Sequence, residues 1–228
     1  MHRWNGRPPV SRTSWAAISA VVLALLFAGT ATVIAAGRDG GAATASTPSA
    51  TSPDAGFARD MAVHHQQAVE MSFIVRDSTD DEEVRRLAYD IANTQANQRG
   101  MLMGWLDMWG LPKTEADQAP MAWMPMDEQM GPGHAMYQAH DGALMPGMAT
   151  SAELDQLRKA RGKQAEILYL QLMTDHHKGG VMMAGACARQ CAPGTERELA
   201  KGMVVSQESE IAQMADLLKE RGAKPRVA

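Results

Sequence analysis

Two pairs of adjacent histidines are the residues of this sequence best suited to chemistry. One pair is His64–His65 and the other is His176–His177. A methionine stands three residues before the first histidine of each pair, and another stands seven residues after it: Met61, Met71, Met173 and Met183. Imidazole nitrogen binds both oxidation states of copper, and thioether sulfur favours Cu(I). If these residues share a helix face, they predict a metal site whose cofactor is copper, as Cu(I) or Cu(II).

A purely structural role for the histidines is the alternative. Neighbouring residues on a helix point about 100° apart, so one histidine of each pair can face the bundle centre while the other faces an adjacent helix. A lone buried histidine is more often a hydrogen-bonded core residue, and methionine at helical spacing is more often packing. Burying four imidazoles without partners costs on the order of a few kcal/mol each, which favours a metal or a dense polar network.

A second group of candidate ligands lies in residues 111–149, where Pro and Gly prevent a regular helix. The group comprises Met121, Met124, Met126, Met130, His134, Met136, His140, Met145 and Met148. Such a flexible array of thioethers and imidazoles could capture Cu(I). The alternative is a hydrophobic loop that folds over the bundle.

Cys187 and Cys191 are the only two cysteines of the chain. They stand four residues apart near the expected end of a helix, close enough for a disulfide if the last turn relaxes. An oxidising compartment favours that disulfide, and thiolate ligation of Cu(I) is the alternative.

The candidate ligands belong to a duplicated unit. The stretch from Phe57 repeats from Tyr169 with a constant offset, 169 minus 57 or 112 residues, and the register holds as far as Gly110 and Gly222. Apolar residues recur at three- and four-residue steps, which indicates helices. Two αα-hairpins bury their apolar stripes best against each other, so the sequence predicts an all-α four-helix bundle.

Turn and cap signals divide the bundle, which we expect over residues 54–222. Hairpin one is predicted at 54–110, the Met-rich insertion at 111–149, hairpin two at 150–222 and a tail at 223–228. Capping boxes are predicted at Thr79 for the second helix and at Thr195 for the last one. Thr150 would begin a short extra helix that runs to about Arg161, with Gly162 ending or kinking it.

The N-terminal part predicts export. Residues 14–37 carry no charge and are long enough to cross a bilayer, and Arg3, Arg7 and Arg12 precede them. We therefore expect residues 1–37 to form a cytoplasmic stub and a signal anchor in the cell membrane, with the C-terminal domain outside. A cleaved signal peptide and a secreted protein are the alternative. Residues 38–53 form a flexible linker of small residues and proline.

Composition and motifs exclude several function classes. The net charge is -4, which argues against nucleic acid as a partner. No nucleophile elbow, phosphate loop or dinucleotide fingerprint is present, so no catalytic residue is predicted. A di-iron enzyme needs Glu-x-x-His on two helices and glutamates on the others, whereas Met61 and Met173 precede the histidines here and Gln95 stands where a carboxylate is wanted.

Four segments of the chain resemble the family called domain of unknown function 305. They are the stretch from Asp54 to Met71, Met121-Ala-Trp123-Met124, Met145-Pro-Gly-Met148, and the stretch from Leu172 to Met183. The resemblance implies a ferritin-like four-helix bundle, exported from bacteria, with members linked to copper binding. It also implies the eight residues of the paired-histidine motifs as ligands: Met61, His64, His65, Met71, Met173, His176, His177 and Met183. Lys178-Gly179-Gly180 departs from the usual motif, and this double glycine either loosens the helix or permits close approach of another segment.

We expect an extracytoplasmic protein that sequesters copper or delivers it through paired histidine and methionine. A metal ion is then the first partner, and a copper transport protein and a second copy of the chain are further ones. The alternatives are a ferritin-like metal oxidase, or a structural interaction bundle without metal.

Overall fold

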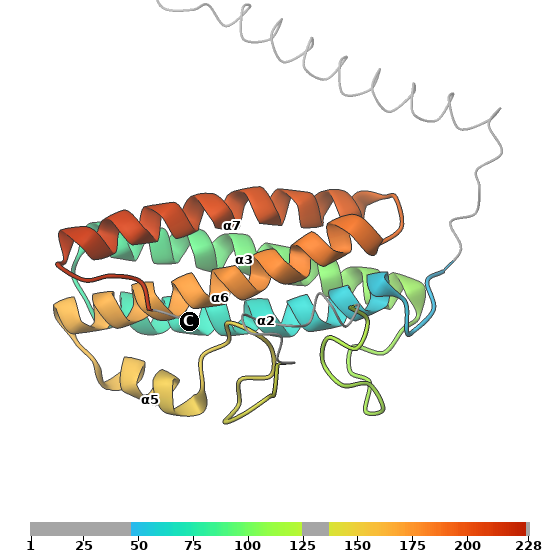
Figure 1. Cartoon of the computed structure of the whole chain (residues 1–228), viewed down its shortest axis with the longest axis horizontal. Helices are drawn as coiled ribbons and strands as arrows, with labels where there is room; N and C mark the ends of the chain where they lie inside the picture. Colours follow the sequence, from blue (N-terminus) through green and yellow to red (C-terminus); the bar gives the residue numbers. More distant parts are fainter. Residues whose placement is uncertain (1–46, 125–136, 227–228) are drawn as a thin grey trace, which may run out of the picture. The chain divides into compact units, whose positions relative to one another are not determined.

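The computed structural model describes residues 47–124 and 137–226. Within these ranges the chain forms five α-helices and no β-strand (Figure 1): α2 (Pro53–Arg76), α3 (Glu82–Trp109), α5 (Ser151–Lys159), α6 (Gly162–Gln190) and α7 (Thr195–Glu220). Helix α2 packs against α3, α6 packs against α7, and α2 and α6 join the two hairpins. The short α5 lies against α2 and α6. The predicted all-α four-helix bundle is confirmed.

The helix starts follow the predicted signals only in part. Thr150 and Glu153 form the predicted capping box of α5. The prediction for Thr79 was wrong, because Asp81 caps α3 while the Thr79 hydroxyl donates to Glu166 on α6 at 2.6 Å. The Thr195 cap was also wrong, since Thr195 is the first residue of α7 and no side chain caps this helix.

The short extra helix α5 ends at Lys159, two residues before the predicted end near Arg161. Gly162, which was predicted to end or kink this helix, is the first residue of α6 and has a positive φ of 52°. A positive φ is readily adopted by glycine, so Gly162 supplies the sharp change of direction between α5 and α6.

The apolar core forms two clusters along the bundle. One contains Val84, Ile91 and Tyr169, and the other contains Phe57 and Leu106. His64 and His65 follow Ala62 of the second cluster and precede Ala68 of the first. His176 and His177 lie between Met173 of the first cluster and Met183 of the second, and all four histidines are fully buried. A polar layer therefore lies between two apolar ones.

The predicted membrane anchor at residues 14–37 lies outside the described residues, as do Met126, Met130, His134 and Met136. None of the helices in 47–124 and 137–226 combines the length and the apolar character needed to span a bilayer.

Candidate metal centre

The rings of His64 and His176 meet at the middle of the bundle. Helix α2 supplies the first and α6 the second, and their ring centroids are 3.7 Å apart with planes inclined by 31°. His64 Nε2 lies 3.3 Å from the carbonyl oxygen of Pro146, and His176 Nε2 lies 2.9 Å from the carbonyl oxygen of His64 itself. A carbonyl oxygen only accepts, so both Nε2 atoms carry the proton.

The second histidine of each pair turns to the neighbouring helix of its own hairpin. His65 Nε2 lies 2.9 Å from Oε1 of Gln98 on α3, and His177 Nε2 lies 2.7 Å from Oε2 of Glu210 on α7. The two partners are related by the same offset, 210 minus 98 or 112 residues. The structure thus brings two imidazoles together and directs the other two apart, as adjacent helical positions require.

The Nδ1 atoms of all four histidines are buried without a hydrogen-bond partner. With Nε2 protonated, the neutral rings of His64 and His176 each present a lone pair on Nδ1. Burial, the largest cause, lowers the pKa of His64 to about 4 and of His65 to about 3, and it lowers the pKa of His176 as well. Neutral imidazole is the form that binds a metal, so these rings are ready to act as ligands.

Two glutamines extend this polar layer. Gln95 on α3 and Gln207 on α7 are buried and occupy equivalent positions of the two hairpins. Both amide atoms of Gln95 and the Oε1 of Gln207 lack a partner. Buried polar atoms normally find partners, so this concentration of free atoms points to a ligand within the layer.

The four motif methionines lie on both sides of the histidine layer, and all are fully buried. Met61 and Met183 belong to the apolar cluster of Phe57, whereas Met71 and Met173 belong to the other. No three histidine nitrogens within 47–124 and 137–226 lie within 4.8 Å of one another. An ion held here would therefore combine the central histidine pair with other donors, and the thioethers on either side are of the right chemical type.

The insertion covers the bundle next to this layer. Its described methionines Met121, Met124 and Met145 are buried in the Phe57 cluster, and Met148 is partly buried beside it. His140 is exposed, with Nδ1 2.9 Å from the carbonyl oxygen of Gln138. These methionines pack as a hydrophobic cover, which was the alternative to an open capture array.

Specific hydrogen bonds hold the insertion in place. Asp60 accepts from the backbone nitrogen of Met121 at 2.6 Å and from Trp123 Nε1 at 2.9 Å. Gln67 donates to the carbonyl oxygen of Ala149 at 2.9 Å and accepts from its backbone nitrogen at 2.6 Å. The segment that carries Pro146 to His64 is thereby fixed at both ends.

The double glycine of α6 lies where this segment crosses the helix. Helix α6 continues unbroken through Gly179 and Gly180. A Cβ at Gly179 would collide with the carbonyl oxygen of Pro146, and one at Gly180 would collide with the Gln207 side chain. The departure from the usual motif therefore permits close approach, and it places the Pro146 carbonyl at His64.

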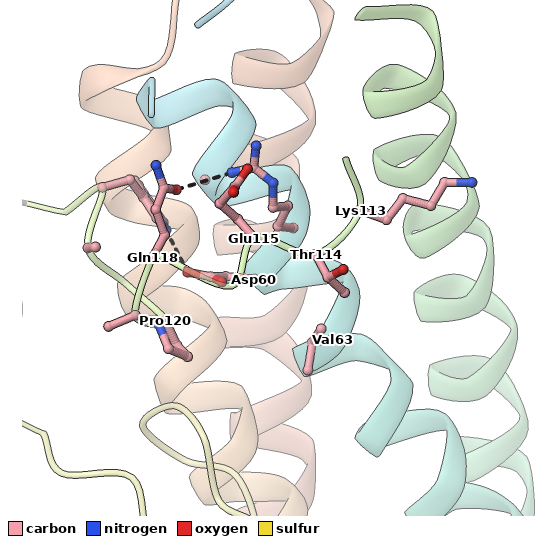
Figure 2. A pocket seen from close by; sticks show the side chains of 12 residues that line it. Asp60, Val63, Lys113, Thr114, Glu115, Gln118 and Pro120 are labelled. Carbon is pink, nitrogen blue, oxygen red and sulfur yellow. Dashed lines mark hydrogen bonds between the residues drawn. The ribbon is translucent and has the colours of Figure 1, made fainter. Parts of the chain in front are cut away.

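An open pocket of about 250 Å³ lies beside α2, between this helix and the insertion (Figure 2). Asp60, Val63, Lys113 and Gln118 are among its lining residues, and Gln118 accepts a hydrogen bond from Arg59 at 3.3 Å. Its lining includes no histidine, cysteine or methionine. The pocket is thus chemically distinct from the histidine layer.

Several residues of the centre were missed by the sequence analysis. Gln98, Glu210, Gln67 and Pro146 orient the histidines or the segment above them. The first two could have been found by applying the repeat offset to the polar residues of the second helices. No comparable pattern identifies Pro146, because the insertion is not repeated.

Cys187 and Cys191 form a disulfide at the end of α6, with an S–S distance of 2.00 Å. Both cysteines are buried, and they lie in the Phe57 cluster.

Comparison with known proteins identifies the family. The model of the domain of unknown function DUF305 matches residues 54–218. A DUF305 protein of Streptomyces coelicolor, named as a secreted protein, superposes with a TM-score of 0.69 at 62% identity, covering 79% of this chain and 100% of its own. A DUF305 fragment from Deinococcus radiodurans gives a TM-score of 0.58 at 29% identity, covering 74% and 96%. No curated protein sequence matched the chain.

Two structures of CopM share the fold at lower identity. Its Cu(I)-bound form gives a TM-score of 0.53 at 21% identity, covering 73% of this chain and 96% of that one. Its Cu(II)-bound form gives 0.52 at 24% identity, covering 74% and 97%. At these identities the likeness concerns the fold alone.

Proposed function

This chain belongs to the DUF305 family, and from that premise we propose that it is an extracytoplasmic protein that binds copper in its histidine layer. The observation that carries the proposal is the set of four buried Nδ1 atoms without partners. Copper-bound CopM, which has the same fold, supports the choice of metal.

The hydrogen bonds around the layer prepare the histidines for this role. Metal-binding histidine commonly donates its second ring N–H to a carbonyl or carboxylate, which fixes the tautomer and raises the basicity of the ligating nitrogen. His64, His176 and His177 each have such an oxygen at Nε2. The central pair, His64 and His176, would hold the ion with Nδ1. Buried thioethers from Met61, Met71, Met173 and Met183 would favour Cu(I).

Storage or delivery fits the layer better than oxidation chemistry. A ferritin-like oxidase uses carboxylates from all four helices. Gln95 and Gln207 supply buried neutral amides instead, while Glu210 is engaged by His177. Buried neutral donors suit a soft monovalent ion, which needs little charge compensation.

An extracytoplasmic location agrees with three observations. The relative from Streptomyces coelicolor is named as a secreted protein. Disulfides such as Cys187–Cys191 persist in oxidising compartments. Residues 14–37 have the length and polarity of a signal anchor.

The test is a thermal melt of the purified protein titrated with Cu(I), Cu(II) and Zn(II). Copper at about 100 times its Kd should stabilise the wild type by about 2.7 kcal/mol through linkage. We expect the double variant His64→Gln/His176→Gln to lose this stabilisation, while the exposed His140→Gln control keeps it. Full retention of copper stabilisation in the double variant would exclude the histidine layer as the site.

Oxidase activity has a separate readout. Purified protein given excess Cu(I) or Fe(II) in air should consume oxygen no faster than buffer with the same metal. Repeated turnover that His64→Gln/His176→Gln abolishes would favour the oxidase instead.

A further inference from the structure

A second cluster of metal-ligating side chains lies far along the bundle from the histidine layer, where α2 begins, α6 ends and α7 begins. In Figure 1 this end is at the right. One carboxylate oxygen each from Asp54 and Glu196 and the Sγ of Cys191 lie within 4.8 Å of one another. Cys187, bonded to Cys191, completes the group.

Glu196 is the side chain that points to a ligand here. It is 6% exposed, and neither of its carboxylate oxygens has a hydrogen-bond partner. Burial first, and then the nearby Asp54, raise its pKa to about 9, so the carboxyl holds a proton at neutral pH. Leaving a buried carboxyl unpaired is costly, and such groups usually reflect a function or a missing ion.

The other end of the bundle indicates that the fold has no need of this carboxyl. By the repeat offset, 196 minus 84, Glu196 corresponds to Val84, which is fully buried in the apolar core. Asp54 corresponds to Glu166, but Glu166 is fully partnered: it accepts from Thr79 at 2.6 Å and from Arg221 at 2.7 Å. At one end the carboxyl is thus fully paired, whereas at the other Asp54 accepts from the backbone nitrogen of Ala192 at 3.0 Å and Glu196 has no partner.

The oxidation state of the sulfur atoms decides how many donors this end of the bundle can offer. A disulfide sulfur is a poor ligand, whereas the thiolate is the form that binds metals. Reduction would turn Cys187, in the last turn of α6, and Cys191, the C-cap of this helix, into two thiols. Two thiolates and two carboxylates are a four-donor set suited to tetrahedral Zn(II).

We propose that Cys187, Cys191, Asp54 and Glu196 form a redox-gated site for a divalent cation of the Zn(II) class. The disulfide closes the site and reduction opens it. The site shares no residue with the histidine layer, so a test of this site does not depend on whether the histidine layer binds copper.

The step balances with a dithiol as the reductant. The dithiol gives two electrons and two protons to the Cys187–Cys191 bond, leaves as its own disulfide, and produces two thiols at the end of α6. The cation then displaces both thiol protons and the proton of Glu196, and these three protons pass to solvent.

Co(II) is the probe, because a thiolate–cobalt bond gives a near-ultraviolet charge-transfer band that histidine or carboxylate ligation lacks. The full chain is reduced with a phosphine, freed of reductant without air, and titrated with Co(II) and then Zn(II). We expect the band in the reduced wild type, its loss when Zn(II) is added, and no band in the oxidised wild type.

The decisive variant is Glu196→Val, which installs the residue found at the equivalent position 84. This variant should fold, and its oxidised form should melt at a higher temperature than the wild type because an unpaired buried carboxyl is gone. Its reduced form should bind Co(II) roughly tenfold or more weakly. The control Glu198→Gln, an exposed glutamate two residues along α7, should bind like the wild type. Absence of the band in the reduced wild type, or equal affinity in the wild type and Glu196→Val, would overturn the proposal.

Discussion

The two hairpins hold equivalent histidines with different partners. In hairpin one, His65 meets the neutral amide of Gln98, and in hairpin two, His177 meets the carboxylate of Glu210 at the same position of the repeat. The amide can present either its oxygen or its nitrogen, whereas a carboxylate only accepts. Glu210 therefore fixes the tautomer of its histidine, and Gln98 leaves that of His65 free to change.

The hairpins also differ where the insertion crosses them. Helix α2 holds the insertion through Gln67, which exchanges two hydrogen bonds with Ala149. The equivalent residue of α6 is Gly179, whose missing side chain makes room for the Pro146 carbonyl. The two hairpins thus share the histidines and the helical backbone, but α2 binds the insertion and α6 leaves room for it.

The largest expected effect concerns acid unfolding of the metal-free protein. The folded pKa values of His64, His65 and His176 lie below the ordinary value of 6.5, mainly because of burial. Below about pH 6.5 these histidines are protonated in the unfolded chain but remain neutral in the folded chain. The free energy of unfolding is therefore highest above that pH and decreases as the pH falls toward 3 to 4. Between pH 7 and pH 4 we expect a loss on the order of several kcal/mol, measured by urea unfolding.

Gln98→Glu sharpens the comparison by giving hairpin one the partner of hairpin two. A carboxylate beside His65 raises the pKa of that histidine, so the variant should keep more of its stability at pH 5 than the wild type. The exposed Glu208→Gln serves as the control and should follow the wild-type pH profile. Identical pH profiles for the wild type and Gln98→Glu would rule out His65 as a source of the acid sensitivity.

The next effect tests the crossing over α6. Gly179→Ala forces the Pro146 carbonyl away from His64, and we expect a loss of about 1–3 kcal/mol of unfolding free energy from overpacking. Gly202→Ala on α7 is the matched control, because a Cβ there meets only open space. That control should gain about 0.5–1 kcal/mol from the higher helix propensity of alanine. A Gly179→Ala variant that is more stable than the wild type would mean that the insertion moves away from α6 without loss of unfolding free energy.

Periodicity and the repeat predicted most of the architecture. Three- and four-residue spacing locates α2 and α6, and it correctly separates His64 from His65, since helical geometry alone decides that separation. Helix starts were harder, because a capping side chain has competing partners. Thr79 illustrates this, since its hydroxyl donates to Glu166, a residue distant in sequence.

The candidate site could be predicted only as far as the repeat reaches. His176 and Glu210 lie on repeated helices, and the offset relates each to a residue of hairpin one. Pro146 belongs to an unrepeated segment, so its contact with His64 depends on tertiary structure. The unpaired carboxyl of Glu196 could not be predicted either, because no sequence pattern indicates that a buried side chain lacks a hydrogen-bond partner.

The smallest expected effect returns to the second histidine of each pair. Glu210→Gln gives both hairpins the same neutral partner and removes the charge that holds the proton on His177 Nε2. Weakening the hydrogen bond at the second nitrogen of a ligating histidine lowers metal affinity by roughly tenfold, so the variant should bind Cu(I) about tenfold more weakly than the wild type if His177 joins the central pair as a ligand. Competition with a chromophoric Cu(I) chelator measures this change.

Gln98→Glu should act in the opposite direction and tighten Cu(I) binding, because it places a second carboxylate at the equivalent histidine. The double variant Gln98→Glu/Glu210→Gln then exchanges the two partners between the hairpins. If His65 and His177 contribute equally to copper binding, the double variant should bind Cu(I) with wild-type affinity. An affinity that stays near that of Glu210→Gln would instead show that His177 contributes more to copper binding than His65, and that the asymmetry of the two hairpins is functional.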